Sequence, residues 1–258
     1  MRSARDLLVI PCFHESPRLG RFLPQLLAGL EQLGGVDVLV VDDGSGPLER
    51  EALQSLIQAQ RHQLRLEVLW LPQNLGKGGA VRAGWDHALG LGRQFDWLGF
   101  VDADGACCAA EVCRLHRSLA ALPEYVAGCF ASRVRMLGRS VNRLWQRHVL
   151  GRVFATMVSR GLQIPAYDTQ CGLKWVRASA YQMMAPRLEC RGFAFDVEWI
   201  AALLDAGFAL REEPIDWTEI AGGKVRLWRD SWSMGWQLLD IARRRRQWRR
   251  EGWPKLKA

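Results

Sequence analysis

Over the first 132 residues, short apolar runs alternate with longer segments in which apolar residues recur every three or four positions. The apolar runs are residues 7–13, 36–41, 64–71, 97–101 and 125–131. The segments between them are 17–33, 48–60, 78–91 and 109–122. Continuous apolar runs are typical of strands buried on both faces, and the wider spacing is typical of amphipathic helices. The alternation therefore predicts an α/β fold, with a mostly parallel sheet flanked by helices.

Right-handed crossovers in such a fold bring the carboxyl ends of the strands to one edge, where open α/β sheets bind ligands. The second half is less regular, and there we expect helices at 141–162 and 195–206 and a strand at 209–215. A chain of 258 residues is enough for one large α/β domain or two small ones. Without an internal repeat or a low-complexity linker, the simplest division is a domain over 1–225 and a tail over 226–258.

Positive charge is concentrated in that tail. Residues 226–258 hold ten Lys and Arg against three Asp and Glu, whereas the rest of the chain holds 25 against 24. The tail also carries Trp228, Trp232 and Trp236 on one helical face, followed by four arginines at 243–246. Tryptophan favours the membrane–water interface, and anionic headgroups attract basic residues. We therefore expect a basic amphipathic helix that binds an anionic membrane surface; a helix docked on the domain, or nucleic-acid binding, are the alternatives.

The expected cellular location follows from three further features. No run of 18 apolar residues is present, so no transmembrane helix is expected. The amino-terminal residues lack the apolar segment and cleavage site of a secretory signal. The seven cysteines form no CxxC pair, which favours buried, reduced thiols over zinc ligands. Together these features predict a cytoplasmic protein, peripheral on the inner face of the membrane.

Two acidic motifs follow predicted strands. In VDDGS, residues 41–45, the carboxylates of Asp42 and Asp43 could bond a ribose hydroxyl or a base edge, or the motif could be a plain turn and helix cap. In DADG, residues 102–105, Asp102 and Asp104 would repel each other unless a cation neutralised them. Mg²⁺ or Mn²⁺ takes carboxylate oxygens together with substrate phosphates. An Asx turn is the alternative for this second motif.

A glycine-rich segment, NLGKGGAVRAG at residues 74–84, opens a predicted helix. Its backbone N–H groups and the helix dipole could cradle a phosphate beside Lys77. The segment does not fit the P-loop pattern, and no GxGxxG follows the first strand, which disfavours a nicotinamide enzyme. Three polar clusters come later, DTQCGLK at 168–174, FAFDVE at 193–198 and EPIDWTE at 213–219. Each of them could also be ordinary capping or loop chemistry.

In this order, the motifs VDDGS, NLGKGGAVRAG, DADG, DTQCGLK, GFAFDVEW and PIDWTEIAGGK resemble those of the family 2 glycosyltransferases. The resemblance is strongest to the branch of the dolichyl-phosphate β-glucosyltransferases and the polyprenyl-phosphate mannosyl- and glucosyltransferases, and it covers about residues 6–225. It implies a glycosyltransferase-A catalytic domain over 1–225, a nucleoside-diphosphate sugar donor, a divalent metal ion and inversion at the anomeric carbon.

The resemblance also implies roles for individual residues on the donor side. Pro11 and Glu15 would line the nucleoside pocket, and Asp42 and Asp43 would contact base and ribose. The remaining donor-side residues would contact the diphosphate or its metal ion; they are Lys77, Asp102 and Asp104.

On the acceptor side, Arg133 falls where lipid-phosphate enzymes of the family place a basic residue near the acceptor phosphate. Asp168, Gln170 and Lys174 match the acceptor motif. Asp196 and Glu198 match the acidic pair of a later helix.

The chemistry depends on what attacks the sugar. A metal ion held by Asp102 and Asp104 would stabilise the charge that develops on the leaving diphosphate. A phosphate monoester is already largely dianionic at neutral pH, so it would need positioning by Arg133 and Lys174 and no strong base. A sugar hydroxyl would need a base, and Asp168 or Asp196 would have to serve.

The leading hypothesis is transfer of a hexose, with glucose from UDP-glucose foremost, to a polyprenyl or dolichyl phosphate at the cytoplasmic face of a membrane. A soluble family 2 enzyme that glycosylates a sugar or small-molecule hydroxyl is the alternative within the class. Outside it stand a catalytically silent nucleotide-sugar-binding protein and a nucleic-acid-binding module. The intact Asp102 and Asp104 disfavour the silent protein, and confinement of the charge to the tail disfavours nucleic acid as a partner.

Overall fold

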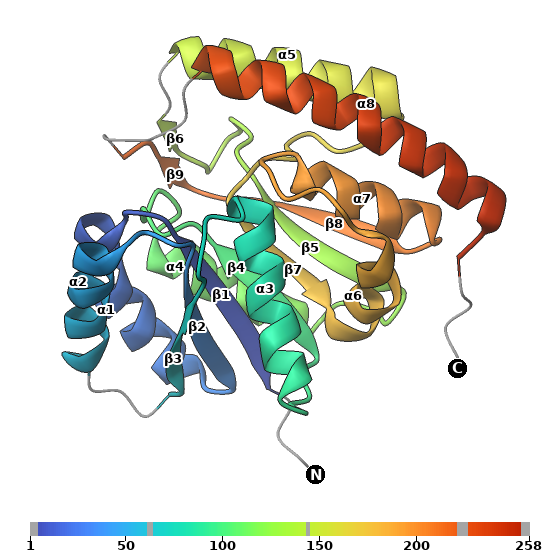
Figure 1. The fold of residues 1–258 in the computed structure, drawn as a ribbon. Coiled ribbons are helices and arrows are strands. Elements are labelled where there is room, and N and C mark those ends of the chain that lie inside the picture. The colour runs from blue at the N-terminus through green and yellow to red at the C-terminus, as the bar shows by residue number, and fades with distance from the viewer. Residues whose placement is uncertain (1–4, 61–63, 143–144, 221–226, 254–258) are drawn as a thin grey trace.

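The computed structural model describes residues 5–60, 64–142, 145–220 and 227–253 of the chain (Figure 1). Within these ranges, only the backbone is described at residues 145–150, 152–153 and 227–234. The expected interfacial side chains of Trp228 and Trp232 fall in the last of these segments.

A seven-stranded sheet forms the centre of the molecule, in the order β3-β2-β1-β4-β7-β5-β8. Its strands are β1 (Asp6–Cys12), β2 (Val36–Asp42), β3 (Leu66–Trp70), β4 (Trp97–Val101), β5 (Val126–Ser132), β7 (Leu173–Arg177) and β8 (Ala209–Pro214). Only β7 runs antiparallel to its neighbours among these seven strands, so the expected mostly parallel sheet is confirmed. Beside it, β6 (Val141–Asn142) and β9 (Trp217–Thr218) form a two-stranded sheet.

Helices cover both faces of the large sheet (Figure 1). One face packs against α1 (Ser16–Leu33), α2 (Pro47–Gln58) and α4 (Ala109–Leu119). The other packs against α3 (Lys77–Gly90), α6 (Ala178–Met184), the short 3₁₀ helix η1 (Ala185–Arg187) and α7 (Phe195–Asp205), with α5 (Trp145–Leu162) and α8 (Leu227–Glu251) outside them. Apart from η1, which has no buried residue, the helices bury apolar side chains in one of two hydrophobic clusters, which accounts for the periodicity seen in the sequence.

The second half differs from the expectation, which included none of β6, β7, α6, η1 and β9. No strand was expected at β7, because Lys174 and Arg177 interrupt its apolar residues. Both cations have specific partners, since Lys174 is fully buried against Asp196 and the Arg177 guanidinium lies 4.5 Å from the centre of the Trp97 ring. The helix expected at 141–162 was also wrong at its start, because residues 141–142 pair with β9 as strand β6 and the helix begins at 145.

Helix α8 packs on the domain along its carboxyl-terminal half. Leu238, Ile241 and Trp248 are buried in the same hydrophobic cluster as α7. Arg245 is also buried, and its guanidinium forms a bidentate pair with Asp205 of α7 at 2.7 and 2.8 Å. Over residues 235–251 the helix therefore has a docked face. Within the described ranges, no helix is both long and apolar enough to cross a bilayer.

Candidate active site

The carboxyl ends of β1, β2, β4 and β5 lie along one edge of the sheet, and antiparallel β7 begins there. In register, Pro11 of β1 stands opposite Val41 of β2. The backbone N–H of Asp102 donates to the carbonyl of Gly172 at 2.9 Å. A Cβ atom on Gly172 would overlap the Asp102 carboxylate, so any side chain at this position would force that carboxylate to move. The fold thus brings the DADG motif into direct contact with the DTQCGLK motif.

Asp43 joins the end of β2 to the glycine-rich segment. Its carboxylate accepts hydrogen bonds from the backbone N–H groups of Leu75 at 2.6 Å and Gly76 at 3.0 Å. Burial raises the pKa of Asp43 to about 6 despite these two bonds. Asp42 is fully buried and accepts a bond from the backbone N–H of Ser45 at 3.3 Å. In this structure the two carboxylates therefore hold backbone in place.

Lys77 begins α3, and its ammonium lies 2.6 Å from the Asp102 carboxylate and 5.1 Å from the centre of the Phe100 ring. Burial disfavours the charged amine, but the carboxylates of Asp102, Asp196 and Asp104 outweigh this effect and raise the pKa of Lys77. A fixed positive charge therefore stands beside the DADG motif, at the amino-terminal end of a helix.

Asp104 accepts a hydrogen bond from the backbone N–H of Ala106 at 3.0 Å and lies 3.7 Å from Arg18. Arg18 in turn donates to Glu15 at 2.6 Å, so this arginine contacts both Glu15 and Asp104. Burial, followed by the charge of Asp102, raises the pKa of Asp104. Asp102 and Asp104 repel each other at the edge of the sheet where such folds bind ligands, and a divalent cation would neutralise this repulsion.

The donor set suits a metal ion that is shared with a substrate. In the described part of the chain, no cluster of three or more His, Cys, Asp or Glu side chains could hold a metal. Mg²⁺ and Mn²⁺ commonly use one or two carboxylates and complete their shell with phosphate oxygens and water. Asp102 and Asp104 fit that arrangement, with the Asp102 side chain 37% exposed.

Arg133, after β5, is paired with Asp168. Its Nε donates to Oδ2 at 2.6 Å and its Nη2 to Oδ1 at 2.8 Å, and the guanidinium lies 5.4 Å from the centre of the Trp217 ring. Burial alone would raise the pKa of Asp168, but Arg133 holds it well below its ordinary range. Gln170 belongs to the same group, because its backbone N–H donates to Asp168 at 3.1 Å.

Two of the expected site residues, Lys174 and Asp196, are buried inside the domain. Lys174 is fully buried, and its ammonium donates to Asp196 at 2.7 Å and to the carbonyl of Cys171. Burial raises the pKa of Asp196 although Lys174 opposes the effect. Glu198 faces away from this pair, since it accepts bonds from the backbone of Glu189 and Cys190 and pairs with an arginine of α8. The acidic pair therefore does not act as one unit.

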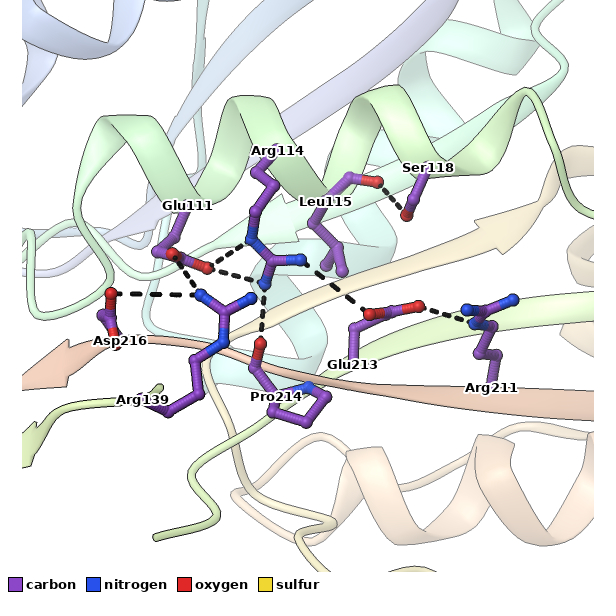
Figure 2. Close-up of polar contacts among 9 residues, drawn as sticks. All are labelled: Glu111, Arg114, Leu115, Ser118, Arg139, Arg211, Glu213, Pro214 and Asp216. Atoms are coloured by element: carbon purple, nitrogen blue, oxygen red, sulfur yellow. Dashed lines mark hydrogen bonds and ion pairs between the residues drawn. The ribbon is translucent and has the colours of Figure 1, made fainter. Parts of the chain in front are cut away.

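A polar network that was not expected from the sequence links α4 to the end of β8 and to Arg139, which precedes β6 (Figure 2). The nearly buried carboxylate of Glu111 on α4 binds Arg114 at 2.7 Å and Arg139 at 3.1 Å. Arg114 also donates to the carbonyl of Pro214 at 2.6 Å, and Arg139 lies 3.9 Å from Asp216. The sequence signals for it were the three-residue spacing of Glu111 and Arg114 and the polar cluster EPIDWTE, which contains Pro214 and Asp216.

Residues 7–183 match the model of glycosyl transferase family 2. The chain belongs to this family. Among its curated relatives, a dolichyl-phosphate β-glucosyltransferase of Mus musculus is 32% identical over 251 residues, which is 91% of this chain and 74% of the relative. The enzyme of that name from Homo sapiens is 31% identical, again over 91% of this chain and 74% of the relative. The enzyme of that name from Saccharomyces cerevisiae is 29% identical, over 91% and 73%.

Solved structures show the fold of this glycosyltransferase. Glucosyl-3-phosphoglycerate synthase from Mycobacterium tuberculosis in complex with UDP superposes with a TM-score of 0.66 at 14% identity, over 93% of this chain and 80% of that one. Its complex with Mn²⁺, UDP-glucose and phosphoglyceric acid gives 0.66 at 15% identity, with the same coverage. The expected glycosyltransferase-A fold and the expected branch of the family are confirmed.

Proposed function

We propose that this glycosyltransferase transfers glucose from UDP-glucose to a dolichyl or other polyprenyl phosphate, with inversion at the anomeric carbon. The support from similarity is its likeness to dolichyl-phosphate β-glucosyltransferases over 91% of the chain. The structural observation that carries the proposal is the state of the two carboxylates that could serve as bases.

Neither carboxylate is suited to deprotonate a hydroxyl. The Asp168 carboxylate is bound at both oxygens by Arg133, and its lowered pKa makes it a weak proton acceptor. Burial raises the pKa of Asp196, but its carboxylate is covered by the protein and already bound to Lys174, away from an acceptor hydroxyl. A phosphate monoester needs no base, because its second pKa is about 6 and it is largely dianionic at neutral pH. The site therefore favours a phosphate acceptor over a sugar hydroxyl.

On the donor side, Asp102 and Asp104 would hold Mg²⁺ or Mn²⁺ together with the diphosphate, and the bound metal would neutralise the charge of the leaving group. Lys77 adds a second positive charge beside it, and the backbone N–H groups at the start of α3 add the helix dipole. Pro11, Asp42 and Asp43 would form the wall of the nucleoside pocket at the ends of β1 and β2.

On the acceptor side, Arg133 and Gln170 would orient the lipid phosphate. One oxygen of that phosphate attacks the anomeric carbon while the bond from this carbon to the diphosphate oxygen breaks. The glucose then carries a new bond to the lipid phosphate, and UDP leaves with the electron pair. Attack opposite the leaving group inverts the configuration.

We also propose that the molecule binds the cytoplasmic face of a membrane through residues 226–258 and the segment between β5 and β6. Large apolar side chains are exposed in both places. Leu137 is 99% exposed and lies two residues after Arg135, and on α8 Trp236 is 65% and Leu239 53% exposed. Apolar side chains beside arginines suit an interface with anionic headgroups.

The function is tested by a transfer assay with labelled UDP-glucose and three acceptors: dolichyl phosphate, dolichol and a simple sugar. We expect label on dolichyl phosphate alone, and only with Mg²⁺ or Mn²⁺ present. The variant Asp104→Ala should lower this transfer about 100-fold or more. Transfer to dolichol or to the sugar, at a rate comparable to that with dolichyl phosphate, would instead favour an enzyme that glycosylates hydroxyl groups.

A further inference from the structure

The loop formed by residues 189–194, between η1 and α7, contacts both sides of the proposed site. On the acceptor side, the Gln170 side chain donates to the carbonyl of Phe193 at 2.9 Å. On the donor side, the backbone N–H of Gly79 donates to the carbonyl of Arg191 at 3.1 Å. The segment that matches the family ends at residue 183, so these contacts lie beyond or across its border.

The loop and the glycine-rich segment touch at backbone distance. A Cβ atom on Gly76 would stand 2.8 Å from the carbonyl oxygen of Arg191. One on Gly78 would stand 2.5 Å from the Cβ of Phe195, which begins α7. At Gly76 no side chain separates the two backbones, so we expect a displacement of the loop to move the glycine-rich segment and with it Lys77.

Helix α8 holds the same loop from the other side. The Oε1 atom of Gln237 accepts a hydrogen bond from the backbone N–H of Ala194 at 3.2 Å and from the thiol of Cys190 at 3.3 Å. Gly192 packs against this amide so closely that a Cβ atom there would stand 2.6 Å from Oε1. The Gln237 side chain thus fits into the loop.

A buried ion pair fixes the position of α8 relative to this loop. Arg244 lies two helical turns after Gln237 and binds the Glu198 carboxylate at 3.0 Å. Glu198 is itself buried and accepts bonds from the backbone N–H groups of Glu189 and Cys190, at the start of the loop. The loop is therefore anchored to α8 at both of its ends.

We propose that Gln237 is a positioning residue for the donor diphosphate, which it never touches: it holds the 189–194 loop, and the loop holds the glycine-rich segment in the geometry that receives the phosphates. The inference rests on the proposed function. It assigns to α8, outside the matched family segment, a part in donor binding.

The test is the dissociation constant of UDP, measured by calorimetry with Mg²⁺ on the full chain. Gln237→Ala removes the acceptor oxygen and should weaken UDP binding about tenfold, the order expected when a hydrogen bond that orders a phosphate site is lost. Gln247→Ala is the matched control, because Gln247 is an exposed glutamine of the same helix whose side chain donates to Glu251 one turn on. It should bind UDP within about twofold of the unaltered chain.

A double-mutant cycle separates positioning from a general loss of stability. Gly192→Ala should weaken UDP binding by itself, because the new methyl group meets the Gln237 amide. In the Gln237→Ala background, Gly192→Ala should weaken UDP binding little further, since the amide that the new methyl group would meet is gone. All proteins are assayed at a temperature where circular dichroism shows them folded.

The outcomes are distinct. Failure of the unaltered chain to bind UDP would remove the proposed function and this inference with it. Normal UDP binding by Gln237→Ala, an equal loss in Gln247→Ala, or fully additive losses in the cycle would overturn the role of Gln237 alone.

Discussion

At the scale of single residues, Asp43 is a carboxylate whose burial sets a measurable pH dependence. Its pKa is about 6 in the folded chain against an ordinary value of 3.8, so the folded state binds this proton more tightly than the unfolded state. The contribution of Asp43 to stability is therefore full below about pH 4 and is lost as the pH rises through 6.

The variant Asp43→Asn carries no charge at any pH and should lack this dependence. Denaturant unfolding at pH 4, 5, 6 and 7 should show the free energy of unfolding of the unaltered chain falling relative to that of Asp43→Asn, with little change above pH 6.5. A constant difference over the whole range would show that folding does not raise the pKa of Asp43.

Arg133 and Asp168 form the second residue pair with a testable energy. Their side chains are each 11% exposed, so removing one partner leaves the other charge in a nearly dry site. We expect Asp168→Ala to lower the free energy of unfolding by about 3 kcal/mol. Glu67→Ala serves as the control, because it removes the partner of Arg93 in a pair that has no role in the site and whose side chains are 19% and 33% exposed. It should lower the free energy of unfolding by about 1 kcal/mol or less.

At the scale of elements, the strands with continuous apolar runs could be predicted from the sequence, and those stabilised by tertiary contacts could not. β1, β2 and β4 are buried along their whole length or nearly so, which is what a continuous apolar run indicates. β7 could not be predicted because a lysine at position 174 indicates an exposed residue. Only the fold brings Asp196, 22 residues later in the chain, beside Lys174 and allows it to be buried.

The same distinction holds for the candidate site. The DADG motif and the glycine-rich segment come together as expected, because strand topology alone brings them to one edge. The Glu111 network and the 189–194 loop could not be foreseen, since Arg139 and Gln237 reach their partners from 28 and 43 residues away in the chain. Long-range side-chain partners leave no periodic signal in a single sequence.

Helix α8 can be tested as a part of the folded domain. Trp248 is 3% exposed within the cluster that also contains Trp199 of α7. Trp248→Ala should therefore lower the free energy of unfolding by about 3–5 kcal/mol, within one cooperative transition. A separate early transition, or no loss of stability, would show that α8 is an independent appendage. Trp236→Ala on the exposed face of the same helix is the control, and should leave the unfolding midpoint nearly unaltered.

At the scale of the whole molecule, the proposed membrane surface predicts a lipid-binding experiment. Vesicles with anionic lipid should carry the protein on flotation, and they should release it as salt is raised, because the Debye length shrinks to about 8 Å at physiological ionic strength. The pair Trp236→Ser and Leu239→Ser should reduce the floated fraction severalfold by removing two exposed apolar groups from α8.

Leu48→Ser supplies the comparison, because Leu48 is 83% exposed on α2, across the sheet from α8 (Figure 1). It should float like the unaltered chain. Equal losses in the two variants, or no loss in either, would contradict a membrane surface that includes α8.

The absence of a side chain at Gly172 has a consequence for sequence variation. Since this glycine fits against the Asp102 carboxylate and its carbonyl accepts a bond from the Asp102 backbone, no other residue can replace it without disturbing the DADG motif. A mutational scan should find position 172 as intolerant as a catalytic carboxylate. Libraries meant to broaden the range of acceptors should therefore diversify residues 165–167, a few positions earlier, and leave this glycine unchanged.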